Sequence, residues 1–422
     1  MIQILQNPSR DTWEALCRRP ASDNPVVLER VRGILQRVKE QGDEALRALS
    51  REIDGRPLDA IEVSQAEIRQ AERRVSPAVK AAVADAAAHI RAFHQAQQPR
   101  EIRVETAPGV TCIQRPVPIG RVGLYIPGGS APLFSTVLML ALPAQIAGCA
   151  EVVLCTPAQS PEVLYAAACC GIHRIFRLGG AQAIAAMAYG TESVPRVDKI
   201  FGPGNQYVTT AKQLLSADTV AIDMPAGPSE VMVIADSTTP AAFAAADLLS
   251  QAEHGPDSQV MLVCESEATC RAVLQEVERQ TSALPRSAIA LQALQKSRAL
   301  VMPSADDRIA FANAYAPEHL IIATESPWDI ADRITNAGSV FVGPYTPESA
   351  GDYASGTNHT LPTNGYATAY SGVNLDSFCR KITYQHITPE GLLQIGRAVQ
   401  LMAEAEQLDA HKNAMTLRLQ SL

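Results

Sequence analysis

The sequence lacks the features that mark secreted, membrane-bound or nucleic-acid-binding proteins. It has no run rich in Lys or Arg and a formal net charge of −8, which disfavours nucleic acid and anionic membranes as partners. Its nine cysteines are an odd number without CxxC spacing, which predicts free thiols in a reducing compartment. No basic segment precedes a long apolar run at the amino terminus, and Pro143 and Gln145 interrupt the most apolar stretch, 137–150. We therefore expect a cytoplasmic protein without a signal peptide or membrane span.

The composition is that of a globular protein with more than one packed unit. The chain has 422 residues, of which 47% are hydrophobic and 19% charged. Residues 1–104 are expected to form a helical region that serves packing or oligomerisation. Apolar residues between Val31 and Leu49 recur at helical spacing, with a weak interruption at Gly42, and Ser64-x-x-Glu67 is a capping box that predicts the start of a further helix.

From about residue 105, short β-branched runs alternate with alanine-rich helical stretches. This alternation is typical of βαβ units on a parallel sheet. We expect an α/β fold with two similar Rossmann-like halves in tandem, 105–228 and 229–380. The expected strands and helices are Val152–Cys155 with a helix to Cys170, Ile172–Leu178 with Ala181–Tyr189, Lys199–Phe201 with Asn205–Leu215, Val231–Ala235 with Pro240–His254, and Gln259–Cys264 with a helix to Leu284.

Two carboxy-terminal segments depart from this alternation. Gly343–Asn374 contains five glycines among polar residues without clear periodicity, and such a segment in a compact domain is usually functional or disordered. Thr388-Pro389 then predicts the start of a helix, with Thr as N-cap and Pro at the first helical position. We expect residues 381–422 to form a helical tail.

One expected helix carries a polar stripe on an otherwise apolar surface. Asp247, Gln251 and His254 share one face of Ala241–His254, and Gly255-Pro256 ends the helix directly after His254. An amide oxygen and an imidazole three residues apart can bind one zinc ion. A stripe of hydrogen-bonded polar groups or a solvated edge explains the pattern equally well, so both interpretations stand.

Other polar residues are ambiguous when taken singly. Glu318-His319 places two proton-transfer groups before an apolar strand, although a surface Glu beside a capping His has the same pattern. Asp352 and His359 lie in the glycine-rich segment, where an Asp is often part of a turn. Five residues separate Glu406 from His411, so a continuous helix would put them on different faces, which predicts a local break or different roles.

Two glycine-containing loops follow expected strands and precede expected helices. They are 125–130, Tyr-Ile-Pro-Gly-Gly-Ser, and 202–205, Gly-Pro-Gly-Asn. Backbone amides in such loops can approach a phosphate or a cofactor at the carboxyl ends of parallel strands. Neither loop has the GxGxxG fingerprint, and glycines there also form plain tight turns.

Taken together, these segments closely resemble the histidinol dehydrogenase family over nearly the whole chain. The segments that carry the resemblance are GLYIPGGSAPLFSTVLML, GGAQAIAAMAYGT, DKIFGPGNQYVT, IDMPAGPSEVMVIAD, DLLSQAEHGPDSQV, APEHL and GDYASGTNHTLPT. The resemblance implies two incomplete Rossmann-like domains with helical amino- and carboxy-terminal parts. It also implies a homodimer whose tail reaches the partner's active site, which would explain the spacing of Glu406 and His411.

The resemblance assigns roles to individual positions, and we see no departure from the family pattern at any of them. Glu318 and His319 match the catalytic acid–base pair. The implied ligands of one zinc ion per subunit are Gln251, His254, Asp352 and His411. The implied substrate contacts are Ser229, His359 and Glu406, together with the four zinc ligands and His319. The implied NAD-binding positions are Tyr125, Gln182 and Asn205.

The implied reaction oxidises L-histidinol through the aldehyde to L-histidine and consumes two NAD and one water. Three alternatives compete with this hypothesis. A thiol-dependent aldehyde dehydrogenase needs an activated cysteine, but the sequence neighbours of Cys149 are apolar. A zinc hydrolase would not explain two α/β halves, and no HExxH motif is present. A non-catalytic zinc- or NAD-binding protein would not need both Glu318 and His319.

Overall fold

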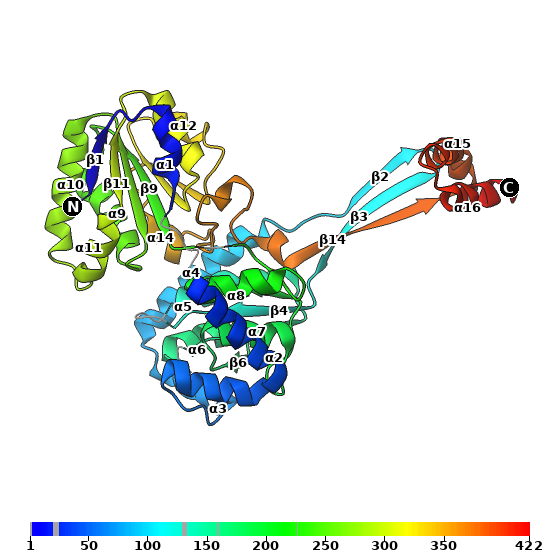
Figure 1. Ribbon diagram of the computed structural model, residues 1–422, viewed down its shortest axis with the longest axis horizontal. Coiled ribbons are helices and arrows are strands. Elements are labelled where there is room, and N and C mark those ends of the chain that lie inside the picture. Colours follow the sequence, from blue (N-terminus) through cyan, green and yellow to red (C-terminus); the bar gives the residue numbers. More distant parts are fainter. Residues whose placement is uncertain (1, 20–24, 129–132, 158–159, 226) are drawn as a thin grey trace.

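The chain folds into two α/β lobes and an extended arm (Figure 1). The computed structural model describes residues 2–19, 25–128, 133–157, 160–225 and 227–422. The lobes lie next to each other, and the arm projects from them and carries the carboxy terminus at its tip (Figure 1). The expected α/β class, with two parallel sheets and helical terminal parts, is confirmed.

A parallel sheet forms the centre of the first lobe, with strand order β6-β5-β4-β7-β8. Its strands are β4 Arg121–Tyr125, β5 Glu151–Cys155, β6 Arg174–Phe176, β7 Lys199–Phe201 and β8 Ala221–Ile222. The chain runs outward from β4 to β6 and then returns to place β7 on the other side of β4. This reversal creates a switch point between β4 and β7, the place where doubly wound sheets bind ligands.

Helices cover both faces of this sheet. They are α2 Pro25–Asp54, α3 Gln65–Arg74, α4 Pro77–Gln95, α5 Phe134–Ala147, α6 Pro161–Cys169, α7 Gly180–Tyr189 and α8 Gln206–Ser216. One apolar cluster packs α3, α4, α5 and α6 against the sheet, and a second packs α2, α7 and α8. The capping box at Ser64 is confirmed, and α2 is kinked at Gly42, whose φ is +52°.

The second lobe is built around another parallel sheet, with strand order β1-β11-β10-β9-β12-β13. Its strands are β1 Gln3–Gln6, β9 Glu230–Ala235, β10 Gln259–Cys264, β11 Arg298–Val301, β12 His319–Ala323 and β13 Ser339–Val342. Its helices are η1 Arg10–Thr12, α1 Trp13–Cys17, α9 Ala241–Ala252, α10 Glu267–Thr281, α11 Ser287–Gln295, α12 Ala305–Tyr315, α13 Pro327–Ala331 and α14 Glu348–Tyr353.

Residues 3–6 differ from the helical structure expected near the amino terminus. They form β1, which pairs in parallel with β11 and so extends the sheet of the second lobe. The pairing joins segments that are distant in sequence. Local propensity therefore gives no signal for it.

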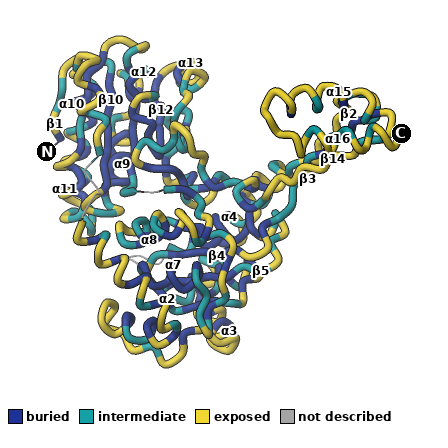
Figure 2. Tube along the Cα trace, turned by 45° about the vertical axis from the view of Figure 1, so that its right-hand side comes forward, coloured by how far each residue is buried: buried dark blue, intermediate teal, exposed yellow. Residues whose placement is uncertain are grey.

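The arm was not expected from the sequence. It consists of the strands β2 Ile102–Ala107, β3 Val110–Pro118 and β14 Cys379–Ile387, which pair antiparallel in the order β14-β3-β2. The short helices η2 Tyr366–Thr368 and η3 Leu375–Phe378 precede β14, and α15 Pro389–Ala405 and α16 Asp409–Gln420 follow it. Thr388 caps α15, as predicted. Figure 2 shows that most of the arm is exposed. Among the described residues, no helix is long and apolar enough to cross a membrane.

A buried ion pair fixes the loop that follows β7. Lys212 of α8 pairs with Asp223, and the two side chains are 4% and 1% exposed. Lys212 Nζ also donates to the carbonyl oxygen of Gly202 at 2.8 Å, and Asp223 accepts from the Gly202 amide at 2.8 Å. Because both charges are buried, each depends on the other for compensation.

We predict that Lys212→Met lowers the free energy of unfolding by about 3 kcal/mol or more, because it leaves the Asp223 carboxylate buried without its counter-charge. Chemical denaturation measures this. The exposed pair Lys381–Asp376 supplies the control, and Lys381→Met should change stability little. Equal effects of the two substitutions would contradict a special contribution from the buried pair.

Candidate active site

Glu318 and His319 lie where the second lobe's sheet begins. His319 is the first residue of β12, and both side chains are buried. Pairing with β9 fixes them, because the Glu230 amide donates to Glu318 Oε2 at 2.9 Å and His319 Nδ1 lies 3.3 Å from the Glu230 carbonyl oxygen. The expected junction of loop and strand is therefore present. The two groups point into one site at the amino ends of the strands.

The start of β9 is itself held by a buried clamp. The guanidinium of Arg19 donates to Glu230 Oε2 from Nε at 2.8 Å and from Nη2 at 2.6 Å. Nη2 also donates to the Tyr315 carbonyl at 2.6 Å, and the guanidinium lies over the Tyr315 ring. Since the backbone of Glu230 contacts both Glu318 and His319, this clamp helps to set their positions.

Helix α14 brings two carboxylates to the same imidazole. His319 Nε2 lies 3.7 Å from Asp352 Oδ1, and His319 Nδ1 lies 3.9 Å from Glu348 Oε1. Possible ligand atoms of His319, Glu348 and Asp352 all lie within 4.8 Å of one another. Within the described part of the chain, neither Glu348 carboxylate oxygen nor His319 Nε2 has a hydrogen-bond partner. The cluster is therefore a possible metal site, to which an imidazole and two carboxylates turn their ligand atoms.

Burial and neighbouring charges act in opposite directions on the pKa values of this cluster. Burial lowers the pKa of His319, but the carboxylates of Glu348, Glu318 and Asp352 outweigh it and raise this pKa to about 10. Burial raises the pKa of Glu318 to about 8, although the His319 charge opposes the shift. Burial also raises the pKa of Glu348 well above its usual range. The site thus holds more acidic groups than it can keep ionised without a further cation.

The polar stripe of α9 faces this cluster in part. α14 packs against α9, and the side chain of Gln251 is fully buried. Neither amide atom of Gln251 has a hydrogen-bond partner among the described residues. His254 lies just beyond the end of α9 and is more exposed; partial desolvation lowers its pKa, and the nearby Asp352 charge opposes that shift. The interpretation of the stripe as hydrogen-bonded polar groups therefore does not hold for Gln251, whose amide is available to a ligand.

His359 and Ser229 approach the site from two loops. His359 Nδ1 donates to the Asp352 carbonyl oxygen at 2.9 Å, and its Nε2 lies 3.0 Å from Thr136 Oγ1 on α5 of the first lobe. Ser229 precedes β9 and is half-buried, and its carbonyl oxygen accepts from the Gln259 amide at 3.1 Å. His359 therefore contacts both lobes next to the acid–base pair.

Glu406 and His411 do not join the other expected site residues within this chain. Both are exposed on the arm, which points away from the two lobes (Figure 1). The predicted local break between them is present, since α15 ends at Ala405, α16 begins at Asp409, and Gln407 has a φ of +59°. The break turns the chain back on itself, and α16 packs against α15.

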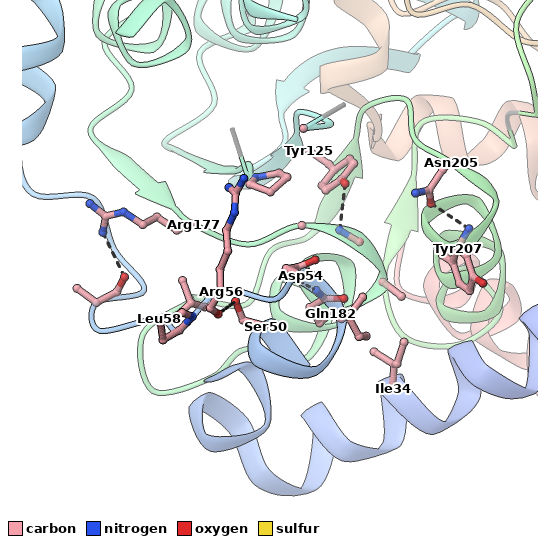
Figure 3. A pocket seen from close by; sticks show the side chains of 18 of the residues that line it. Ile34, Ser50, Asp54, Arg56, Leu58, Tyr125, Arg177, Gln182, Asn205 and Tyr207 are labelled. Atoms are coloured by element: carbon pink, nitrogen blue, oxygen red, sulfur yellow. Dashed lines mark hydrogen bonds between the residues drawn. The ribbon is translucent and has the colours of Figure 1, made fainter. Parts of the chain in front are cut away.

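The three positions expected to bind NAD lie together in the first lobe. Tyr125, Gln182 and Asn205 line one cavity of about 1070 Å³ (Figure 3). Tyr125 is the last residue of β4 and Asn205 lies in the loop after β7, so the cavity opens at the switch point of the sheet. Its volume is large enough for a dinucleotide. Of the expected glycine loop 125–130, residues 129 and 130 lie outside the described residues.

The cavity residues are fixed by local contacts. The Tyr125 hydroxyl accepts from the Gly180 amide at 3.1 Å, and Gln182 Nε2 donates to Asp54 Oδ2 at 3.2 Å. The Asn205 side chain caps α8 by accepting from the amides of Tyr207 and Val208. Two helices, α7 and α8, thus begin at the cavity and direct their positive dipole ends towards it.

Sequence reasoning missed two groups of residues at these sites. One wall of the cavity comes from the helical region that was expected to serve only packing or oligomerisation: Arg30, Ile34, Ser50, Ile53, Asp54, Arg56, Pro57, Leu58, Asp59 and Ala60. Nothing in the helical periodicity distinguishes these residues. Glu348 was also missed, although its spacing of four residues from Asp352 puts both carboxylates on one face of a helix.

Cys149, the candidate nucleophile of a thiol-dependent mechanism, is not activated. All nine lie in the described part of the chain and are free. Burial raises the pKa of Cys149 to about 12, and its Sγ lies 3.9 Å from the Phe378 carbonyl oxygen. A thiol with such a high pKa is almost entirely protonated at neutral pH, and the thiolate is the nucleophilic form.

A buried acid–base pair at a possible metal site, with a dinucleotide-sized cavity in the adjoining lobe, is the site of an oxidoreductase. Comparison with known proteins identifies its family. Residues 17–419 match the family described as histidinol dehydrogenase. The chain therefore belongs to the histidinol dehydrogenase family, whose members act on histidinol in histidine biosynthesis.

Individual relatives agree with this assignment over the full length. The chain is 55% identical over 427 residues to histidinol dehydrogenase of Bacteroides thetaiotaomicron, with all of both chains covered. It is 54% identical to the enzyme of Yersinia pestis, with 99% of this chain and 95% of that one covered. The crystal structure of histidinol dehydrogenase from Elizabethkingia anophelis superimposes with a TM-score of 0.96 at 51% identity, covering 100% of this chain and 98% of that one.

We predict that Cys149→Ala keeps most of the histidinol dehydrogenase activity, because the thiol is protonated and touches no acid–base group. The substitution should at most lower the melting temperature through loss of packing around Sγ. Steady-state kinetics and a thermal melt on the same preparation separate the two effects. A loss of turnover of about a thousandfold with an unchanged melting temperature would instead indicate a thiol mechanism.

Proposed function

We propose that this chain carries out the zinc- and NAD-dependent four-electron oxidation of L-histidinol, through L-histidinaldehyde, to L-histidine. The observation that carries the proposal is the pair Glu318 and His319, buried together beside the Asp352 carboxylate of α14. Two adjacent acid–base groups suit a reaction with two different proton abstractions. A reducing cytoplasm, which free thiols suit, is the proposed location, and neither nucleic acid nor a membrane is a proposed partner.

The donor atoms around Asp352 fit a zinc ion. The buried amide oxygen of Gln251 lacks a hydrogen-bond partner among the described residues, and the charges of Asp352 and His254 act on each other. With His411 of the partner subunit, these groups form the proposed nitrogen and oxygen ligand set. When bound, zinc would hold the amino and imidazole nitrogens of histidinol and so fix the carbinol next to the acid–base pair.

His319, Glu348 and Asp352 are a second possible ligand combination, and Asp352 belongs to both. We favour the first set because it leaves His319 Nε2 available to accept a proton. A cation at Asp352 would also counter one of the charges that raise the pKa of His319, which helps the imidazole to act as a base. In this arrangement Glu348 is not a zinc ligand, and its carboxylate lies on the Nδ1 side of the His319 ring.

The cavity around Tyr125, Gln182 and Asn205 is the proposed NAD site. Its place at the switch point of the sheet and its volume support this assignment. When bound there, NAD would supply the hydride acceptor, and two NAD would be needed for each histidinol oxidised. The amino ends of α7 and α8 favour the negatively charged pyrophosphate, and the Tyr125 hydroxyl holds the Gly180 amide at the start of α7.

The chain's own groups account for the proton transfers. His319 Nε2 accepts the carbinol proton as the hydride leaves the carbinol carbon, giving the aldehyde. Glu318 then accepts a proton from water as the water oxygen bonds to the aldehyde carbon, and the aldehyde oxygen takes back the proton held by His319, giving the hydrate. His319 accepts one hydroxyl proton of the hydrate as the second hydride leaves, giving the carboxylic acid. The pKa of Glu318, about 8, lies near neutrality and suits a group that accepts and releases protons.

The remaining substrate contacts and the assembly complete the proposal. On this chain Ser229 directly precedes β9 and His359 contacts the Asp352 backbone, whereas Glu406 and His411 lie on the arm. We propose a homodimer in which the arm of each subunit reaches the active site of the other. The arm exposes apolar residues that such a contact would cover, among them Leu393, Met402 and Leu417, each more than half exposed.

The proposal predicts that the purified protein reduces NAD when histidinol is added, that a strong chelator abolishes this, and that zinc restores it. Only one ligand of the proposed set, Asp352, carries a full negative charge, so binding should be reversible. Absorbance at the NADH band measures turnover, and metal analysis confirms removal. Full turnover of a metal-free preparation would contradict the zinc assignment, and histidinol oxidation without NAD would contradict the cofactor assignment.

Substitution of each of the two bases, His319 and Glu318, should affect the two oxidation steps differently. We predict that His319→Asn slows both histidinol and histidinal oxidation by about a hundredfold or more, because both steps lose the imidazole. Glu318→Gln should mainly slow histidinal oxidation, since only that step needs activated water. Kinetics started from each substrate measure the two steps. If Glu318→Gln slows the two oxidations equally, the proposed division of labour is wrong.

A composite site predicts that two inactive variants rescue each other. His254→Ala removes a ligand from the lobe, and His411→Ala removes one from the arm. A mixed dimer then contains one intact site and one site with both defects, so about half of the wild-type turnover per dimer should return. Subunits with different affinity tags allow the heterodimers to be isolated and assayed. Verified heterodimers without activity would show that the arm serves its own subunit.

A further inference from the structure

The carboxylate of Asp54 occupies a place that local helix energetics disfavour. Asp54 is the last residue of α2 and lines the cavity of the first lobe. The carboxyl end of a helix carries a partial negative charge, so this position favours Lys or Arg over Asp. A residue that breaks a local rule without an evident structural gain often serves function.

A hydrogen bond orients this carboxylate within the cavity. Gln182 Nε2 on the first turn of α7 donates to Asp54 Oδ2 at 3.2 Å, and Gln182 is itself buried. Figure 3 shows Asp54 and Gln182 close together between the side of the cavity marked by Asn205 and the side marked by Leu58. Partial desolvation raises the pKa of Asp54, and the charge of Arg56 opposes that shift. The carboxylate therefore lies on the same cavity wall as the guanidinium of Arg56.

The two lobes indicate how a dinucleotide would be oriented. Its nicotinamide half must approach His319 in the second lobe, and His359, next to that site, contacts the first lobe at Thr136 in the helix that follows β4. Asn205 and Tyr207 lie on that side of the cavity. The adenosine half then extends to the opposite side, towards Leu58 and Arg177, past Asp54 and Gln182 (Figure 3).

We propose that Asp54 selects NAD over NADP by accepting hydrogen bonds from the ribose hydroxyls of the adenosine half, an inference that rests on the proposed NAD site. A carboxylate accepts bonds from a 2′-hydroxyl and repels a 2′-phosphate. Arg56 alone would attract that phosphate, since a guanidinium binds phosphate oxygens well. Asp54 balances the charge of Arg56 and keeps the wall suited to an unphosphorylated ribose.

The test compares two ligands that represent the adenosine half, ADP-ribose and 2′-phospho-ADP-ribose, by calorimetric titration. Asp54→Ala should weaken ADP-ribose binding by roughly tenfold or more, the scale of a hydrogen bond to a charged group. It should also bring the affinity for 2′-phospho-ADP-ribose closer to that for ADP-ribose. Arg56→Ala added to Asp54→Ala should remove the gain for the phosphorylated ligand.

Glu52→Gln is the matched control. Glu52 lies two residues earlier on the same helix and pairs with Arg37 instead of lining the cavity, so its loss should leave both affinities unchanged. If wild type binds ADP-ribose and Asp54→Ala leaves the ratio of the two affinities unchanged, the role of Asp54 is contradicted while the NAD site stands. If wild type binds neither ADP-ribose nor NAD, the cofactor assignment falls and this inference falls with it.

Discussion

The pairing of β12 with β9 is the contact on which the active site depends. It sets His319 opposite Val231 in register, and it lets the backbone of Glu230 bond Glu318 on one side and His319 on the other. A slip of one residue would turn the imidazole to the other face of the sheet. Arg19, in the amino-terminal segment, donates buried hydrogen bonds to the Glu230 side chain and so fixes the start of β9 as well. Register and side-chain contacts thus fix one arrangement of Glu318 and His319.

Much of the fold could be predicted from the sequence because its signals are local. The alternation of β-branched and alanine-rich stretches gave β5, β7 and β10 to within one residue and the ends of their following helices to within three. The caps at Ser64 and Thr388 depend on side chains only three residues from the amides they bind. The break between Glu406 and His411 also followed from spacing alone. Glu318 and His319 were recognised as a pair, but only the structure shows how the fold buries them.

Other features could not be predicted because they depend on contacts between distant segments. β1 joins the second sheet through β11, and β14 joins β3 to make the arm. The cavity wall contributed by α2 exists only because this helix packs beside α7, and no local sequence pattern predicts that packing. The resemblance to a family supplied a ligand set, but it did not suggest Glu348, whose carboxylate lies behind His319. A single chain likewise cannot bring His411 to the lobe.

In the proposed dimer, one zinc ion joins the lobe of one subunit to the arm of its partner. Crystals of the zinc-loaded protein measured on both sides of the zinc absorption edge test this directly. The account predicts one anomalous peak per subunit, bounded by Gln251, His254 and Asp352 of one chain and by His411 of the other. A peak at His319, Glu348 and Asp352 without a residue from the second chain would contradict it, and so would an arm that contacts no neighbouring active site.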